Sequence, residues 1–137
     1  MADTVRRVEY RYATVSDAPG NVQPILSALQ DNGVNLVAFL GFPRGEGQSQ
    51  IDLVPEDPDA LRRAAEQAGV TLSEAKQAFL IQGDDRVGAV ADATEKLAAA
   101  NVNITAAAAI AAGSGRYGMI LWVAQADYDT AAGALGA

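Results

Sequence analysis

Two short loops in this chain carry residue types that suit the two charged ends of a small zwitterion. Asp17-Ala18-Pro19-Gly20 and Asp85-Arg86-Val87-Gly88 each stand just before an apolar helical pattern. An aspartate there can face an ammonium group. A glycine leaves backbone N–H groups uncovered at a helix start, where they and the helix dipole favour a carboxylate. Asn35 and Asn103, on neighbouring predicted strands, can both donate and accept hydrogen bonds.

A plainer interpretation of the same residues stays open. Aspartate is a common N-cap, glycine permits close packing of helix on strand, and asparagine often turns the chain after a helix. On that interpretation Asp17 and Asp85 serve only to begin their helices. Repetition of both loops and both asparagines raises the ligand interpretation to about even with the plain one.

The composition removes most enzyme chemistry. None of the 137 residues is cysteine or histidine, which excludes thiolate nucleophiles, imidazole bases and the usual zinc ligands. Gly113-Ser114-Gly115-Arg116-Tyr117-Gly118 matches a dinucleotide-binding pattern, but a strand pattern follows it where a helix is required. We therefore predict a protein that is not an enzyme and needs no metal or cofactor.

The formal net charge of −7 opposes binding to phosphate backbones and to anionic lipid. We expect no nucleic-acid partner. The N-terminus lacks an apolar signal core, and the longest apolar run, Ala106 to Ala112, is too short to span a bilayer. We therefore expect a cytoplasmic protein that has no membrane partner.

The second half of the chain repeats the first without a gap at a shift of 68 positions, from residue 17 to residue 85. This register places Leu29 on Leu97, Val34-Asn35 on Val102-Asn103, and the glycines at 45 and 47 on those at 113 and 115. Such self-similarity is the signature of a duplicated unit. We predict two modules, residues 1–75 and 76–137.

Each module is predicted to follow the order β-α-β-β-α-β. Alternation at Val8 and Tyr10 indicates a strand, and apolar residues at helical spacing from Val22 to Leu29 indicate a helix that ends at Asn32-Gly33. A hairpin with its loop at residues 43–47 and a helix that begins at Asp57-Pro58 follow. Val70 to Ala75 is predicted to be the fourth strand.

Two features distinguish the second copy from the first. Its Ile104 to Ala112 segment is rich in alanine, which favours helix, yet the repeat register predicts a strand there. Its fourth strand would begin one position beyond Ala137, so the second module lacks its last strand. We expect the edge beside residues 77–82 to be covered by the N-terminal extension or by a second chain.

The loop Asp17-x-Pro-Gly20 and the run Asn32-Gly33-Val34-Asn35-Leu36, present in a duplicated βαββαβ order, resemble the signature of the ACT domain. The resemblance implies an α+β fold of two ferredoxin-like modules with antiparallel sheets and helices on one face. It also implies a non-catalytic regulatory protein that binds a small ligand, expected to be an amino acid, where ACT modules meet. The alternative is a ligand-free subunit that docks on a metabolic enzyme or a transcription regulator.

The resemblance implies two further features. Paired modules imply a homodimer. The ligand would be bound by the loops and the following strands of both copies, and these candidate residues are Asp17, Ala18, Pro19, Gly20, Asn21, Val22, Asn35, Leu36, Asp85, Arg86, Val87, Gly88, Ala89, Val90, Asn103 and Ile104.

Overall fold

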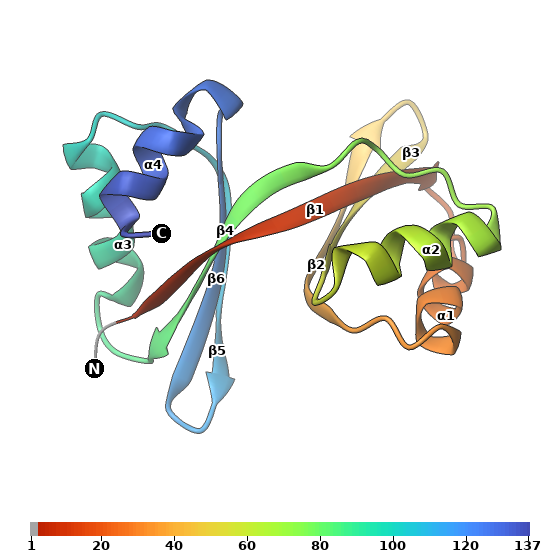
Figure 1. Cartoon of the computed structure of the whole chain (residues 1–137), viewed down its shortest axis with the longest axis horizontal. Helices are drawn as coiled ribbons and strands as arrows, with labels where there is room; N and C mark the ends of the chain where they lie inside the picture. The colour runs from red at the N-terminus through yellow and green to blue at the C-terminus, as the bar shows by residue number, and fades with distance from the viewer. Residues whose placement is uncertain (1–2) are drawn as a thin grey trace. The chain divides into compact units, whose positions relative to one another are not determined.

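A computed structural model describes residues 3–137, and the chain divides into two compact units (Figure 1). The first unit is Glu9–Lys76. The second unit joins the start of the chain, up to Val8, to Gln77–Ala137. Each unit is described by itself below.

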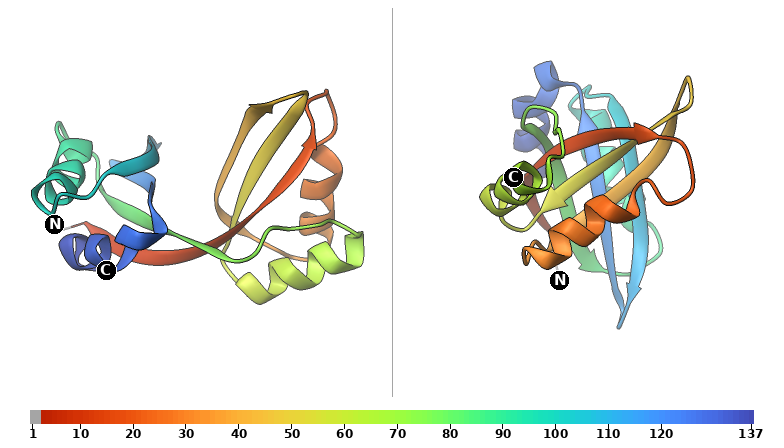
Figure 2. Two further views of the ribbon diagram at one scale, coloured as in Figure 1. Left: turned by 90° about the horizontal axis from the view of Figure 1, so that it is seen from above. Right: turned by 90° about the vertical axis from the view of Figure 1, so that its right-hand side faces the viewer.

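The first unit contains the later part of β1 (Thr4–Ser16), α1 (Gln23–Asp31), β2 (Leu36–Gly45), β3 (Gln48–Pro55) and α2 (Pro58–Ala68). Its strands pair antiparallel in the order β2-β3-β1. Both helices cover one face of this sheet (Figure 2). The core between helices and sheet is formed by Ala13, Leu29, Ile51, Leu53, Leu61 and Ala64.

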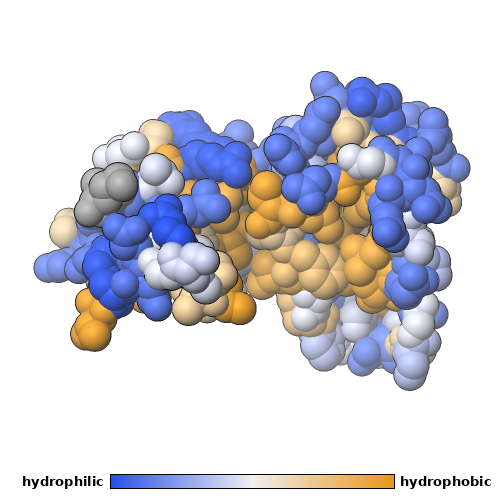
Figure 3. All heavy atoms as spheres, turned by 90° about the horizontal axis from the view of Figure 1, so that it is seen from below, coloured by the Kyte–Doolittle hydropathy of each residue, from blue (hydrophilic) through white to orange (hydrophobic). Residues whose placement is uncertain are grey.

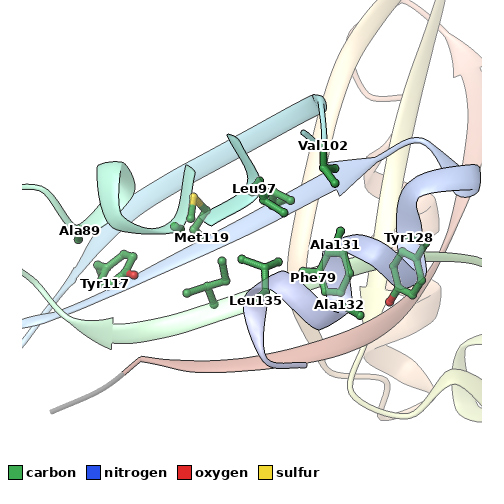
Figure 4. Packing of buried hydrophobic residues seen from close by; sticks show 13 residues of the cluster. Phe79, Ala89, Leu97, Val102, Tyr117, Met119, Tyr128, Ala131, Ala132 and Leu135 are labelled. Carbon is green, nitrogen blue, oxygen red and sulfur yellow. The ribbon is translucent and has the colours of Figure 1, made fainter. Parts of the chain in front are cut away.

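The second unit contains β4 (Lys76–Asp84), α3 (Ala89–Ala99), β5 (Ile104–Gly113), β6 (Arg116–Val123), a 3₁₀ turn (Gln125–Asp127) and α4 (Tyr128–Leu135). Its strand order is β1-β4-β6-β5. Figure 4 shows its core, in which Leu97 of α3 and Leu135 of α4 lie over Phe79 and Met119. Phe79 stacks on Tyr128 with ring centroids 4.5 Å apart.

The predicted α+β fold of two ferredoxin-like units is confirmed, together with several element ends. Asp57 caps α2 by accepting the N–H groups of Asp59 and Ala60, and Gly69 ends that helix in the left-handed conformation. Gly33 and Asn101, which are equivalent in the repeat, follow α1 and α3 with φ of 68° and 58°. The two halves therefore have the same left-handed backbone conformation at this position, with different residues.

The alanine-rich segment of the second copy is a strand, as the repeat predicted. β5 pairs along its length with β6, and Ala107 lies opposite Leu121. Helix propensity differs by less than 1 kcal/mol per residue between alanine and ordinary residues. A full ladder of hydrogen bonds to β6 outweighs that local preference.

The N-terminal segment covers the edge of β4. The start of β1 lies beside β4, and the Thr4 hydroxyl donates to the carbonyl of Gln82 at 3.3 Å. Val5 packs against the core of the second unit. The first of the two expected covers, the N-terminal extension, is the one observed.

Three details of the prediction were wrong. Val70 to Ala75 forms no regular strand. One backbone bond to β1 is made, from Ser73 N–H to Tyr12 O, but the return bond from Tyr12 N–H goes to the side chain of Ser73, to Oγ, instead of to a carbonyl. The hairpin loop is shorter than predicted, since β2 continues to Gly45. The sequence pattern predicts the first helix of the second copy over residues 86–100, but α3 begins at Ala89, because Gly88 adopts a left-handed conformation.

Among the residues described, no helix is long and apolar enough to cross a membrane.

Candidate functional site

The loop between β4 and α3 leaves the first turn of α3 open. Gly88 stands at the N-cap with φ of 86°, and no side chain caps the helix there. The N–H groups of a first turn have no partner within their own helix. The Ala89 N–H already donates to the carbonyl of Arg86 at 3.3 Å, so the first-turn donors left for an anion are those of Val90 and Ala91.

A shallow pocket of about 270 Å³ opens beside this helix start. Ala109 and Ala111 of β5 form its opposite wall; they pair with Met119 and Tyr117, whose side chains are buried in the helix-covered core. Alternation along a strand therefore points both alanines toward the start of α3. The pocket is lined by Asp85, Arg86, Gly88, Ala89, Val90, Ala91, Ala109, Ile110, Ala111 and Tyr117.

Exposed apolar side chains surround the pocket. The exposed fraction is 73% for Ile110, 44% for Val90 and 105% for Val87. The pocket thus combines a polar loop and a helix start with exposed apolar side chains nearby.

Arg86 is held by a network of carboxylates. Its Nη1 donates to Asp3 Oδ1 at 3.1 Å and to the carbonyl of Asp84 at 3.0 Å. Its Nη2 donates to Asp92 Oδ2 at 2.8 Å and to Asp3 Oδ2 at 3.4 Å. All four hydrogens of the two terminal nitrogens are therefore matched by acceptors of the chain itself.

Asp3 is the partly buried centre of this network, with its side chain 12% exposed. Tyr117 donates its hydroxyl to Asp3 Oδ2 at 2.7 Å. Burial by itself raises the pKa of Asp3, but hydrogen bonds from Arg86 and Tyr117 and the charge of Arg86 lower it more, so the carboxyl remains ionised. Burial and the bond to Asp3 raise the pKa of Tyr117 to about 12.

Gly83 on β4 makes room for Asp3, because any Cβ at residue 83 would collide with the Asp3 carboxylate. Asp3 and β4 are thus fitted to one another.

The matching loop of the first unit has the same backbone but not the same charges. Asp17 N–H donates to Gly47 O at 2.8 Å, as Asp85 N–H does to Gly115 O at 2.8 Å. Gly20 has φ of 84°. In the repeat register, however, Ala18, Pro24 and Ser49 stand where the second unit has Arg86, Asp92 and Tyr117.

No family model matches the chain, and a search of curated proteins finds no match. Solved structures match nearly its whole length. A protein from Bacteroides thetaiotaomicron has a TM-score of 0.82 at 15% identity, covering 96% of this chain and 88% of that one. The ligand-free regulatory subunit of aspartate kinase from Thermus thermophilus has a TM-score of 0.65 at 16% identity, covering 98% and 94%. The corresponding subunit from Thermus flavus has a TM-score of 0.56 at 16% identity, covering 99% and 95%.

The chain has the tandem ACT-domain fold. Each half contributes one ACT-type loop between a strand and a helix, in the places that the sequence motifs indicated.

Within this ACT fold, the candidate residues fall into separate groups. Asp85, Arg86, Gly88, Ala89 and Val90 meet in the pocket. Val87 is fully exposed, while Ile104 packs against the core of the second unit. Neither Asn103 nor Ile104 lines the pocket, whose strand wall lies farther along β5.

In the first unit, Asn35 and Leu36 lie in a different open hollow, of about 470 Å³, with Gly33 and the end of α1. Asn35 donates its amide to Glu56 Oε2 at 3.0 Å. The loop residues Ala18, Pro19 and Gly20 are exposed. The remaining loop candidates are Asp17, Asn21 and Val22; Asn21 donates its amide to the carbonyl of Ser16 at 3.0 Å.

The N-cap interpretation of the two aspartates was wrong. The residues at the caps of α1 and α3 are Val22 and Gly88, and neither helix is capped by a side chain. Asp17 and Asp85 lie earlier in their loops.

Sequence reasoning missed Asp3, Asp92, Tyr117 and the alanines of β5. Comparing the two copies offered one signal, since Arg86 and Tyr117 replace Ala18 and Ser49 at equivalent positions. Asp3 gave no signal, because it lies 83 residues from its partner Arg86.

Proposed function

We propose that this chain is a non-catalytic regulatory protein that binds a free amino acid in the pocket beside α3. The observation that carries the proposal is the meeting of an uncapped helix start at Gly88 with Asp85 in one pocket. The helix start suits a carboxylate and Asp85 suits an ammonium group. The solved structures of aspartate kinase regulatory subunits, which share the fold, support a regulatory rather than a catalytic function.

We propose further that a second copy of the chain pairs along β5 and completes the binding site. β5 is an edge strand in the second unit, and every residue from Thr105 to Gly113 is exposed. Natural edge strands usually carry lysine, proline or other protection against pairing, and this one carries mostly alanine. A second β5, antiparallel to the first, would also cover the exposed Ile110.

Oligomeric state tests the pairing. The wild type is expected to be a dimer by light scattering coupled to gel filtration. Ala107→Lys places a charge in the middle of the edge and is expected to give a monomer. A wild-type monomer at micromolar concentration would contradict the pairing.

A thermal-shift screen over the standard amino acids tests ligand binding. A ligand that binds only the folded state stabilises it by about 2.7 kcal/mol at 100 times its dissociation constant. Ala109→Trp should fill the pocket and abolish the response. Ala112→Trp is the matched control, since residue 112 lies on the same strand, is exposed, and does not line the pocket.

If the wild type responds to no amino acid, the proposed function fails. A response that survives Ala109→Trp would place the ligand elsewhere.

A second candidate function is ligand-free docking on a metabolic enzyme or transcription regulator. Exposed apolar side chains on the first unit favour it: Phe39 and Phe42 of β2 are 42% and 41% exposed, on opposite faces of the strand. Figure 3 shows apolar residues gathered on one face of the same unit, at the right of the view. Contiguous apolar surface often marks an interaction site. Retention of a partner by the wild type and its loss in Phe39→Ser would support docking.

A further inference from the structure

The N-terminal Asp3 reaches the pocket loop and satisfies Arg86, a residue that lines the pocket. An arginine in a ligand pocket is ordinarily the group that binds a carboxylate, because its fork of N–H donors matches the two oxygens. Here the chain supplies that carboxylate itself. Asp3 takes one hydrogen from each terminal nitrogen, and Asp92 and the carbonyl of Asp84 take the other two.

The charge around the pocket follows from this arrangement. Arg86 is offset by Asp3 and Asp92, and Arg116 is offset by Asp84, which it contacts at 2.7 Å. Asp85 adds a further negative charge to the lining. The pocket therefore carries excess negative charge although it contains an arginine.

We propose that Asp3 determines the ligand selectivity of this pocket: by occupying Arg86, it excludes amino acids whose side chain carries a carboxylate and leaves the site to neutral or basic ones. This inference rests on the proposed amino-acid binding. A second ligand carboxylate would find no free hydrogen on the terminal nitrogens of Arg86 and would lie near three or more aspartates. The α-carboxylate is not affected, since it is assigned to the helix start at Gly88.

The other copy supports the assignment of a specific function to this network. Ala18, Pro24 and Ser49 replace Arg86, Asp92 and Tyr117 there, while the glycine turn and the backbone bond to the hairpin are retained. The network is thus not required to build the loop.

The test compares glutamate with glutamine, which have nearly the same shape and differ in one charge. Calorimetry on the full chain is expected to give at least tenfold tighter binding of glutamine by the wild type. Asp3→Asn frees donors of Arg86 and removes one negative charge. We expect it to reduce the preference for glutamine about tenfold, with a smaller loss of affinity for glutamine itself.

Asp129→Asn is the matched control. Asp129 also pairs with an arginine of β1, Arg7 at 3.7 Å, and its side chain is 96% exposed. The variant changes the net charge by the same amount without touching Arg86, so its glutamate-to-glutamine ratio should equal that of the wild type.

Asp3→Asn could also act by loosening the N-terminal strand. Asp92→Asn is a second variant without that effect, because it removes the contact of Arg86 with α3 and leaves Asp3 in place. It should shift the ratio in the same direction by a smaller factor. A ratio unchanged in both variants, with amino acids still bound, overturns the selectivity proposal alone. Failure of the wild type and Asp3→Asn to bind any amino acid overturns the proposed function and this inference together.

Discussion

Tyr117→Phe isolates the hydrogen bond that Tyr117 donates to Asp3. The ring of Tyr117 is 4% exposed and packs in the core of the second unit, so phenylalanine keeps the packing and loses only the hydroxyl. Hydrogen bonds to charged groups contribute about 1.5–3 kcal/mol to stability. We therefore expect Tyr117→Phe to lower the free energy of unfolding by about 1.5–3 kcal/mol near pH 7.

The pH dependence follows from the two pKa shifts. The pKa of Asp3 is lowered in the folded state, so its contribution is present above the unfolded value of about 3.9 and is lost as pH falls through the folded value. The pKa of Tyr117 is raised to about 12, so its contribution is present below about 10 and is lost as pH rises through 12. The cost of Tyr117→Phe should be largest between about pH 5 and 9.

Urea unfolding at pH 3, 7 and 9 measures this cost, with Tyr128→Phe as the matched control. Tyr128 is also buried in the second unit, but its hydroxyl donates to a neutral acceptor, the carbonyl of Ala78, at 3.1 Å. Its substitution should cost about 1 kcal/mol at both pH 3 and pH 7. If the cost of Tyr117→Phe does not decrease at all as pH is lowered from 7 toward and below 3, the bond to an ionised Asp3 is not what the hydroxyl contributes.

Two further predictions concern the first unit. Asp57→Ala removes the side-chain cap of α2 and should lower the free energy of unfolding by about 0.5–2 kcal/mol, measured by urea unfolding, whereas an unchanged value would show that the cap contributes nothing. Asp52→Asn should stabilise the protein at pH 7: burial raises the pKa of Asp52 despite its bond from Gln50 at 2.8 Å and the charge of Lys76. The ionised form is thus disfavoured in the folded state, so the gain in thermal midpoint should shrink as pH falls toward 4, and a loss of stability at pH 7 would contradict this reasoning.

Much of the fold was predictable because the duplication provides two sequences for each element, and their patterns can be compared. The helix that begins after Asp57 and ends at Gly69 has local signals at both ends. The strand at Ile104–Gly113 has none, and composition alone predicts a helix there. The register with Leu36–Gly45 identified it, since both segments lie between the same Val-Asn pair and the same hairpin glycines.

The candidate site was less predictable because its parts come from distant segments. The motif named the loop residues Asp85, Arg86 and Gly88 as candidates, and all three line one pocket. The motif also pointed to Asn103 as the facing strand residue, whereas the pocket wall is formed near Ala109. Which stretch of a strand faces a loop depends on pairing register, and β5 shifts register against β6 near both of its ends.

The sequence by itself determined the β-α-β-β-α order that both units share, because the repeat register compares each element with its copy. It also determined the helix ends at Gly33 and Asn101 and the glycine turns of both loops, because these depend on residues within one turn of chain. Only the tertiary structure decided that the N-terminal segment lies beside β4 and brings Asp3 to Arg86 and Tyr117. Asp3 lies 83 positions from Arg86 and 114 positions from Tyr117, so no local sequence pattern indicates these contacts. Their meeting follows from burial of a strand edge, a property of the folded sheet as a whole.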